Sequence, residues 1–209
     1  MRILIADDHA VVRQGLMLIL ARALGPVEFG EAANSRQTIA AALQQPWDLL
    51  ILDLSMPGRN GLEVLKELKT QRPALPVLVL SMHAEEQYAV RAFRAGAVGY
   101  LTKASASVEL VKAVERILAG GRYVSATMGE KLASALGGPG HALLHEKLSD
   151  RELEILRLIA SGRTVKEIAV ELTLSVNTIS TYRTRLLEKM NMRTNAELTH
   201  YAISNGLVE

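Results

Sequence analysis

The sequence contains no cysteine in its 209 residues, which excludes disulfide bonds, thiolate catalysis and cysteine-based zinc sites. It also has little net charge, only +2 at pH 7, so any basic surface must be local. No apolar run is long enough to cross a bilayer, and the N-terminus turns acidic at Asp7, too early for a secretory signal. We therefore expect a soluble cytoplasmic protein with no membrane segment.

What the sequence does contain is enough apolar material, 49% of its residues, for two domains. Its most informative stretch is 48–58, where four aliphatic residues lead into Asp53 and Met56-Pro57-Gly58 ends the run. A short run that is apolar on both faces predicts a buried strand of a parallel sheet. Asp53 would then lie at the carboxyl end of that strand, where open α/β sheets bind ligands. If this strand stood alone, Asp53 would be better explained as a turn-capping residue.

Short apolar runs alternate with helical patterns throughout residues 1–122, the first expected domain. The expected strands cover residues 3–6, 27–29, 49–53, 77–80 and 98–101. The expected helices cover residues 10–24, 35–44 (capped by Ser35), 61–69, 85–94 and 107–118. Five strands alternating with five helices predict an α/β fold, a doubly wound parallel sheet with helices on both faces.

Polar residues follow four of these strands at their carboxyl ends: Asp7, Asp8, Asp53, Ser81 and Lys103. Because the carboxyl ends of parallel strands share one edge, these side chains should converge. Clustered carboxylates repel each other unless a cation holds them, and Mg²⁺ is the natural occupant of a site with oxygen ligands. Three acids, a metal, a hydroxyl and a lysine suit phosphoryl transfer to a carboxylate.

This set resembles the flavodoxin-like receiver domain of two-component response regulators. The resemblance rests on Asp7-Asp8, on Asp53-x-x-Met-Pro-Gly, on Ser81 and on Thr102-Lys103. It implies that Asp53 accepts phosphate and that Asp7, Asp8, Asp53 and the main-chain carbonyl of Ser55 hold Mg²⁺. It further implies that Ser81 donates a hydrogen bond to the phosphoryl group and that Lys103 pairs with it.

The resemblance also assigns Tyr100 as the aromatic residue that turns inward when the Ser81 hydroxyl moves; the alternative is an exposed residue of an edge strand. Two residues depart from the family pattern: Ala104 replaces the usual proline after the lysine, and Met82 replaces a small residue. Neither removes a chemical group from the site. They bear on the rate of phosphate turnover.

Residues 123–145 are expected to form a linker with a possible helix at 125–136, followed by Gly137-Gly138-Pro139-Gly140. Two histidines, His141 and His145, stand four residues apart in this linker. A metal site on a helix is conceivable for them, but solvated linker residues are the favoured interpretation.

Residues 146–209 form the second expected domain, with four short helices at 150–160, 165–172, 176–190 and 195–204. Capping boxes begin three of them at Ser149, Thr164 and Thr194, and Ser175 can cap the fourth. Only residues 173–175 separate the middle pair, which is typical of a helix-turn-helix.

The polar face of helix 176–190 can read base edges or contact phosphates, and basic residues are concentrated there. An all-helical protein-interaction module would explain the caps but not this placement of charge. The candidate DNA contacts are Asn177, Thr178, Ser180, Thr181, Tyr182, Arg183, Thr184, Arg185 and Lys189.

This second domain resembles the DNA-binding domain of LuxR-type regulators, through Leu148-Ser149-x-Arg151-Glu152, Lys166-Glu167-Ile168-Ala169 and Leu187-Glu188-Lys189-Met190. Together the two domains resemble the NarL/FixJ family of response regulators. The family implies a sensor histidine kinase as phosphate donor, promoter DNA as partner, and dimers in which helix 195–204 contributes contacts.

Two other functions compete with this interpretation. A phosphatase of the haloacid dehalogenase type requires Asp-x-Asp, but Ser55 stands two residues after Asp53, so an enzyme beyond self-phosphorylation and dephosphorylation is not expected. A scaffold with a vestigial acidic site is the second alternative, which the intact set of Asp8, Asp53, Ser81 and Lys103 disfavours.

Overall fold

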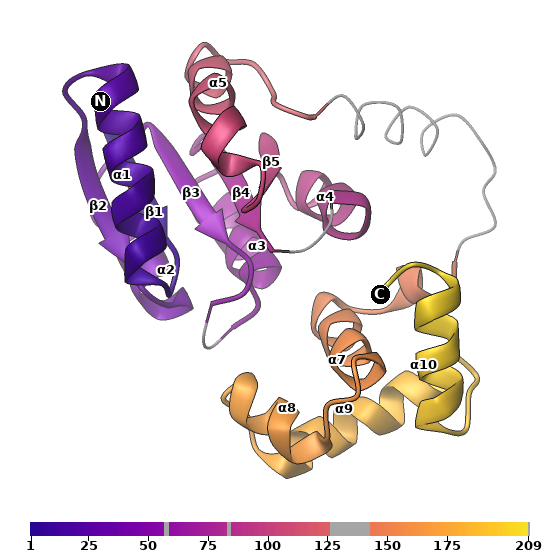
Figure 1. Ribbon diagram of the computed structural model, residues 1–209. Coiled ribbons are helices and arrows are strands. Elements are labelled where there is room, and N and C mark those ends of the chain that lie inside the picture. Colours follow the sequence, from indigo (N-terminus) through magenta and orange to yellow (C-terminus); the bar gives the residue numbers. More distant parts are fainter. Residues whose placement is uncertain (57–58, 83–84, 126–142, 209) are drawn as a thin grey trace. The chain divides into compact units, whose positions relative to one another are not determined.

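The computed structural model describes residues 1–56, 59–82, 85–125 and 143–208. The chain divides into two compact units, Met1–Gly138 and Pro139–Glu209. The first unit is built around a sheet and the second is helical in the part that the structure describes (Figure 1). The expected domain boundaries at 122/123 and 145/146 remain predictions.

The sheet of the first unit has five parallel strands in the order β2-β1-β3-β4-β5. Their bounds are β1 Arg2–Ala6, β2 Glu28–Ala32, β3 Leu49–Asp53, β4 Val77–Ser81 and β5 Gly99–Thr102. Every residue of β3 and β4 is buried, which explains why both strands are apolar up to their last residues, Asp53 and Ser81. The predicted doubly wound fold is confirmed.

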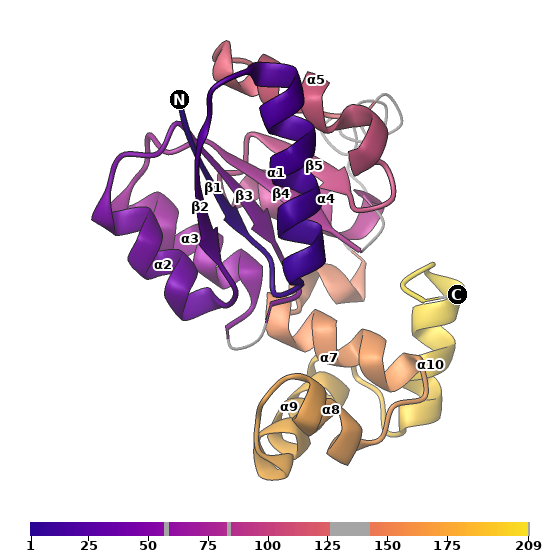
Figure 2. The same ribbon diagram turned by 60° about the vertical axis from the view of Figure 1, so that its left-hand side comes forward.

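In the part of the first unit that the structure describes, five helices cover the two faces of this sheet (Figure 2). They are α1 Ala10–Leu24, α2 Ser35–Gln44, α3 Gly61–Gln71, α4 Glu85–Arg94 and α5 Ala106–Leu118. Helices α1 and α5 pack together, and their apolar side chains meet those of the strands in one buried core. Helices α2, α3 and α4 cover the other face, where α3 contacts both α2 and α4.

The structure differs from the predicted bounds where pairing or side-chain contacts override the local pattern. β2 continues to Ala32 because it pairs with β1 along its whole length. Asn34, not Ser35, caps α2: its side chain accepts a hydrogen bond from the Gln37 N–H at 2.9 Å. The Ser35 hydroxyl is used elsewhere, since it accepts a hydrogen bond from the Arg59 N–H at 3.1 Å.

Tyr123 also differs from expectation, because we placed it in the linker. Its backbone N–H donates to the Val98 carbonyl at 2.9 Å, and it forms a parallel bridge with Gly99. Its side chain is buried in the core shared by α1 and α5. Apart from Ser125, the possible helix at 125–136 lies outside the described residues.

The second unit contains a short 3₁₀ helix, η1 Leu144–Lys147, before four α-helices. These are α7 Asp150–Ala160, α8 Val165–Glu171, α9 Val176–Lys189 and α10 Asn195–Ser204. All three predicted capping boxes are present, and Ser175 caps α9. Ile168, Ile179 and Leu186 are fully buried between the helices, as the helix-turn-helix pattern requires. Among the described helices, none combines the length and apolar character needed to cross a membrane.

Candidate functional site

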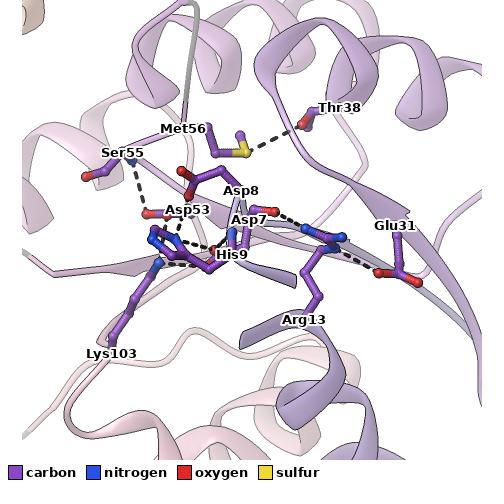
Figure 3. A network of polar contacts seen from close by, with 10 residues as sticks. All are labelled: Asp7, Asp8, His9, Arg13, Glu31, Thr38, Asp53, Ser55, Met56 and Lys103. Atoms are coloured by element: carbon purple, nitrogen blue, oxygen red, sulfur yellow. Dashed lines mark hydrogen bonds and ion pairs between the residues drawn. The ribbon is translucent and has the colours of Figure 1, made fainter. Parts of the chain in front are cut away.

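An acidic site lies at the carboxyl edge of the sheet, where β1, β3 and β5 deliver Asp7, Asp53 and Lys103 (Figure 3). The Lys103 ammonium nitrogen lies 2.6 Å from Asp7 Oδ2 and 2.8 Å from Asp53 Oδ2. Both carboxylates are buried, and the lysine side chain is only 12% exposed. One cation therefore joins two acids that follow different strands.

Burial and pairing set the charges of this site. Burial raises the pKa of Asp53 above its usual value, although the Lys103 hydrogen bond and charge oppose that rise. Desolvation alone would lower the pKa of Lys103, but its hydrogen bonds to Asp53 and Asp7 raise it. Lys103 therefore stays protonated at neutral pH and partly neutralises the acids.

The loop after β1 adds two more potential ligands, Asp8 and His9. The His9 N–H donates to Asp7 Oδ1 at 2.8 Å, and His9 Nδ1 lies 2.7 Å from Asp8 Oδ1. Ligand atoms of Asp7, Asp8, His9 and Asp53 all lie within 4.8 Å of one another. His9 was not among the residues we predicted for the site. Its position directly after the paired aspartates was the available signal.

The donor chemistry of this cluster fits a hard divalent cation. Oxygen ligands dominate, and Asp7 Oδ2 and Asp8 Oδ1 are buried without a well-directed hydrogen-bond donor, although both have an ionic neighbour. Such oxygens gain from a cation that satisfies their remaining lone pairs.

The loop after β3 positions Asp53 from the other side. The Ser55 N–H donates to Asp53 Oδ1 at 3.1 Å, so each carboxylate oxygen of Asp53 has one protein donor. Gly61, at the start of α3, packs directly on this loop: a Cβ there would lie 2.5 Å from Leu54 Cα and 2.8 Å from the Asp53 carbonyl oxygen. No larger residue fits without moving the backbone that carries Asp53.

Ser81 and Tyr100 occupy the neighbouring strands. Ser81 is buried at the end of β4, and its carbonyl accepts a hydrogen bond from the Lys103 N–H at 2.8 Å. Tyr100 is 1% exposed, so the alternative that it is an exposed edge residue is wrong. Met82 is exposed beside Ser81.

In the second unit, the predicted DNA-contacting face of α9 is accessible. Thr178, Tyr182 and Arg183 are half-buried, and the other predicted contacts are exposed: Asn177, Ser180, Thr181, Thr184, Arg185 and Lys189. The hydroxyls of Ser180, Thr181 and Thr184 donate to main-chain carbonyls four residues earlier. The hydroxyl oxygens of all three can still accept hydrogen bonds, and the two threonines also carry methyl groups on this exposed face.

The three cations of α9 have different surroundings. Arg183 Nε donates to Asn195 Oδ1 at 2.6 Å, and the Lys189 ammonium pairs with Glu152 Oε2 at 2.7 Å. Arg185 is exposed and has no polar partner among the described residues. It is therefore the cation of this face that is most available to a phosphate. Sequence patterns gave no indication of the pairing of Lys189 with Glu152.

The prediction that His145 is a solvated linker residue is wrong. It lies in η1, where its Nδ1 is 2.9 Å from the Tyr201 hydroxyl of α10, with the two rings edge to face. The last turn before α7 is thereby attached to α10. His141 lies outside the described residues.

A sheet edge with paired acids and a lysine, joined in one chain to a helix-turn-helix, defines a phosphate-receiving regulator that binds DNA. Two family models match accordingly: the response regulator receiver domain over residues 3–115, and the bacterial regulatory proteins of the luxR family over residues 146–202. The chain belongs to the response regulators of the NarL/FixJ type, which are phosphorylation-dependent transcriptional regulators.

The chain is similar along its whole length to individual members of this family. Response regulator UvrY of Escherichia coli K12 is 34% identical over 206 residues, which cover 98% of this chain and 94% of that protein. Response regulator GacA of Pseudomonas aeruginosa is 34% identical over 209 residues, 100% and 98% of the two chains. RcsB from Salmonella enterica serovar Typhimurium, bound to promoter rprA in the presence of the phosphomimetic BeF3-, matches with a TM-score of 0.66 and 30% identity over 98% of this chain and 99% of that one.

Proposed function

We propose that Asp53 is the phosphate acceptor of this response regulator and that a sensor histidine kinase supplies the phosphoryl group. The observation that carries the proposal is the Lys103 ammonium held between Asp53 and Asp7 at 2.8 and 2.6 Å. A carboxylate oxygen of Asp53 forms the new bond to phosphorus while the bond from phosphorus to the donor breaks. Lys103 then neutralises a phosphoryl oxygen, and Ser81 donates its hydroxyl to another.

Asp7, Asp8, Asp53 and the Ser55 carbonyl would hold Mg²⁺ in this proposal. When bound, the ion supplies charge that offsets the phosphoryl oxygens and the acids around them. The Ser55 N–H and Lys103 keep the Asp53 carboxylate oriented toward the incoming phosphorus. The reaction is confined to the protein's own phosphorylation and dephosphorylation.

The output is sequence-specific binding of promoter DNA through α9. Its exposed polar face, with Arg185 available, suits a recognition helix in the major groove. We further propose that the protein acts in the cytoplasm as a homodimer on DNA, with α10 in the dimer contact. An open, mostly apolar groove on this part of the unit supports such a contact; it is lined by Met192, Ala196, Glu197, His200, Tyr201 and Ser204.

Phosphorylation should raise DNA affinity by favouring the dimer, with Ser81 and Tyr100 transmitting the change from Asp53. Addition of beryllofluoride and MgCl₂ to the full chain should tighten operator binding by about fivefold to 150-fold, the usual range for coupled sites. The measurements are fluorescence anisotropy with promoter DNA and sedimentation of the same samples. EDTA should return both to the basal values. Beryllofluoride bound at Asp53 without any change in affinity or association would overturn the coupling.

Arg185→Ala should weaken binding to all DNA sequences and reduce the salt dependence of the binding constant. One lost phosphate contact lowers the slope of log K against log salt by about 0.9. Arg163→Ala is the matched control, because Arg163 is an exposed arginine of the same unit that lies outside α9. Equal slopes for both variants would place the phosphate-binding surface elsewhere.

A further inference from the structure

Arg13, on the first turns of α1, contacts the loop that carries Asp7 and Asp8. Its guanidinium donates from a terminal nitrogen to the Asp7 carbonyl oxygen at 2.7 Å and from Nε to Glu31 Oε2 at 2.8 Å (Figure 3). The side chain is only 13% exposed. A half-buried arginine thus spans from β2 to the main chain of the acidic site.

The backbone N–H and carbonyl of Asp7 are both hydrogen-bonded, the first to β2 and the second to α1. Its N–H donates to the Ala32 carbonyl at 3.1 Å, and its carbonyl accepts from Arg13. A peptide unit is planar, so fixing the Asp7 carbonyl oxygen also fixes the direction in which the Asp8 Cα leaves it. Asp8 is the least buried acid of the cluster, and its side chain contacts the exposed His9.

We propose that Arg13 is a positioning residue for the metal site: it orients the Asp7–Asp8 peptide so that the Asp8 carboxylate faces Asp53. Glu31 orients the guanidinium of Arg13 by accepting a hydrogen bond from Nε, so that a terminal nitrogen reaches the Asp7 carbonyl oxygen. The inference rests on the proposed Mg²⁺ site. Arg13 itself touches neither the metal nor the phosphoryl group.

A positioning role and a purely electrostatic role predict opposite effects. Arg13 is a cation near a site for a dication, so its charge alone repels the metal. If charge were its only effect, Arg13→Ala would tighten metal binding. If it orients Asp8, the same substitution weakens binding, and loss of an outer-shell partner typically costs tenfold to a hundredfold in metal affinity.

The test is a Mn²⁺ titration of the full chain, in which electron paramagnetic resonance measures the free ion. Arg13→Ala should weaken Mn²⁺ binding by about tenfold or more. Arg13→Lys keeps the charge, but its single nitrogen on a shorter side chain cannot occupy both guanidinium donor positions, so it should weaken binding by a smaller factor. Arg22→Ala is the matched control, since Arg22 is an exposed arginine of the same helix, and it should leave the affinity unchanged.

Unchanged or tighter Mn²⁺ binding in Arg13→Ala would overturn this inference alone. Absence of binding to the unsubstituted chain would overturn the proposed metal site instead. If Arg13→Ala fails to fold, Arg13→Lys decides: affinity equal to that of the unsubstituted chain would refute the positioning role, because its charge is conserved.

Discussion

Asp53→Ala should abolish phosphate incorporation from acetyl phosphate while leaving the fold intact. The acyl phosphate requires the carboxylate oxygen, and no other described acid is both paired with Lys103 and bonded to the loop after β3. The fold should survive because Lys103 keeps its partner Asp7 when Asp53 is removed. Incorporation is measured with radiolabelled acetyl phosphate and confirmed as an acyl phosphate by its release with hydroxylamine.

Asp48→Ala is the matched control for that experiment. Asp48 immediately precedes β3, at the end of the strand opposite to Asp53, where its carboxylate accepts a hydrogen bond from the Arg2 N–H at 2.7 Å. This variant should label as the unsubstituted chain does. Undiminished labelling of Asp53→Ala would show that another side chain is the acceptor.

Lys189→Met should destabilise the DNA-binding unit by about 1–3 kcal/mol, in addition to any effect on DNA contacts. The Glu152 side chain is 4% exposed and pairs with Lys189, which is 46% exposed. Removal of the lysine leaves a buried carboxylate that keeps hydrogen bonds only to Ser149, a neutral residue, among the described residues. This value lies below the roughly 3–5 kcal/mol that broken buried pairs cost, because Lys189 is largely exposed and water screens its side of the pair.

Hydrogen exchange of the α7 and α9 amides measures this loss in the full chain. Lys166→Met is the matched control: Lys166 is exposed on α8, and no polar partner is found for it among the described residues. The double variant Lys189→Met with Glu152→Gln should recover part of the lost stability, since it removes the unpaired charge. Equal protection in Lys189→Met and Lys166→Met would contradict the structural role of the pair.

The same pair gives the DNA-binding unit a pH dependence. Burial alone would raise the pKa of Glu152, but hydrogen bonds from Lys189 and the Ser149 main chain lower it below its usual value. Because the pKa of Glu152 is lower in the folded protein than in the unfolded chain, its ionised form stabilises the fold. This contribution is fully present at pH values above the unfolded pKa of about 4.3, and it is lost as the pH falls through the folded pKa. Protection of α7 should therefore decline in acid, and less steeply in Lys189→Met.

Most of the fold was predictable because its signals are local. The buried strands β3 and β4 are apolar up to their last residue, and Ser149, Thr164 and Thr194 each begin a helix with a capping box. The signals that failed depend on distant partners. Asn34 caps α2 while the Ser35 hydroxyl accepts a hydrogen bond from the distant Arg59 N–H, and Tyr123 forms a bridge with Gly99 of β5.

Part of the acidic site was predictable because the topology of a parallel sheet determines where its strand ends lie. Strand ends of a parallel sheet must converge, so Asp7, Asp53 and Lys103 could be placed together before their distances were known. The supporting contacts could not be placed in this way. Arg13 reaches the loop through a guanidinium whose direction depends on Glu31, and Lys189 finds Glu152 across 37 positions of sequence.

The bridge between Gly99 and Tyr123 also bears on how the chain folds during translation. Parallel pairing joins residues far apart in sequence, which makes such sheets slow to form. Among the described residues of that core, Tyr123 is the last to emerge from the ribosome, so this part of the core cannot be completed until residue 123 is free. The helices of the second unit, whose neighbours α8 and α9 are separated by only a few residues, are synthesised afterwards. The first unit, whose parallel sheet folds more slowly, is therefore synthesised first. This order gives the sheet time to fold before the DNA-binding helices are complete.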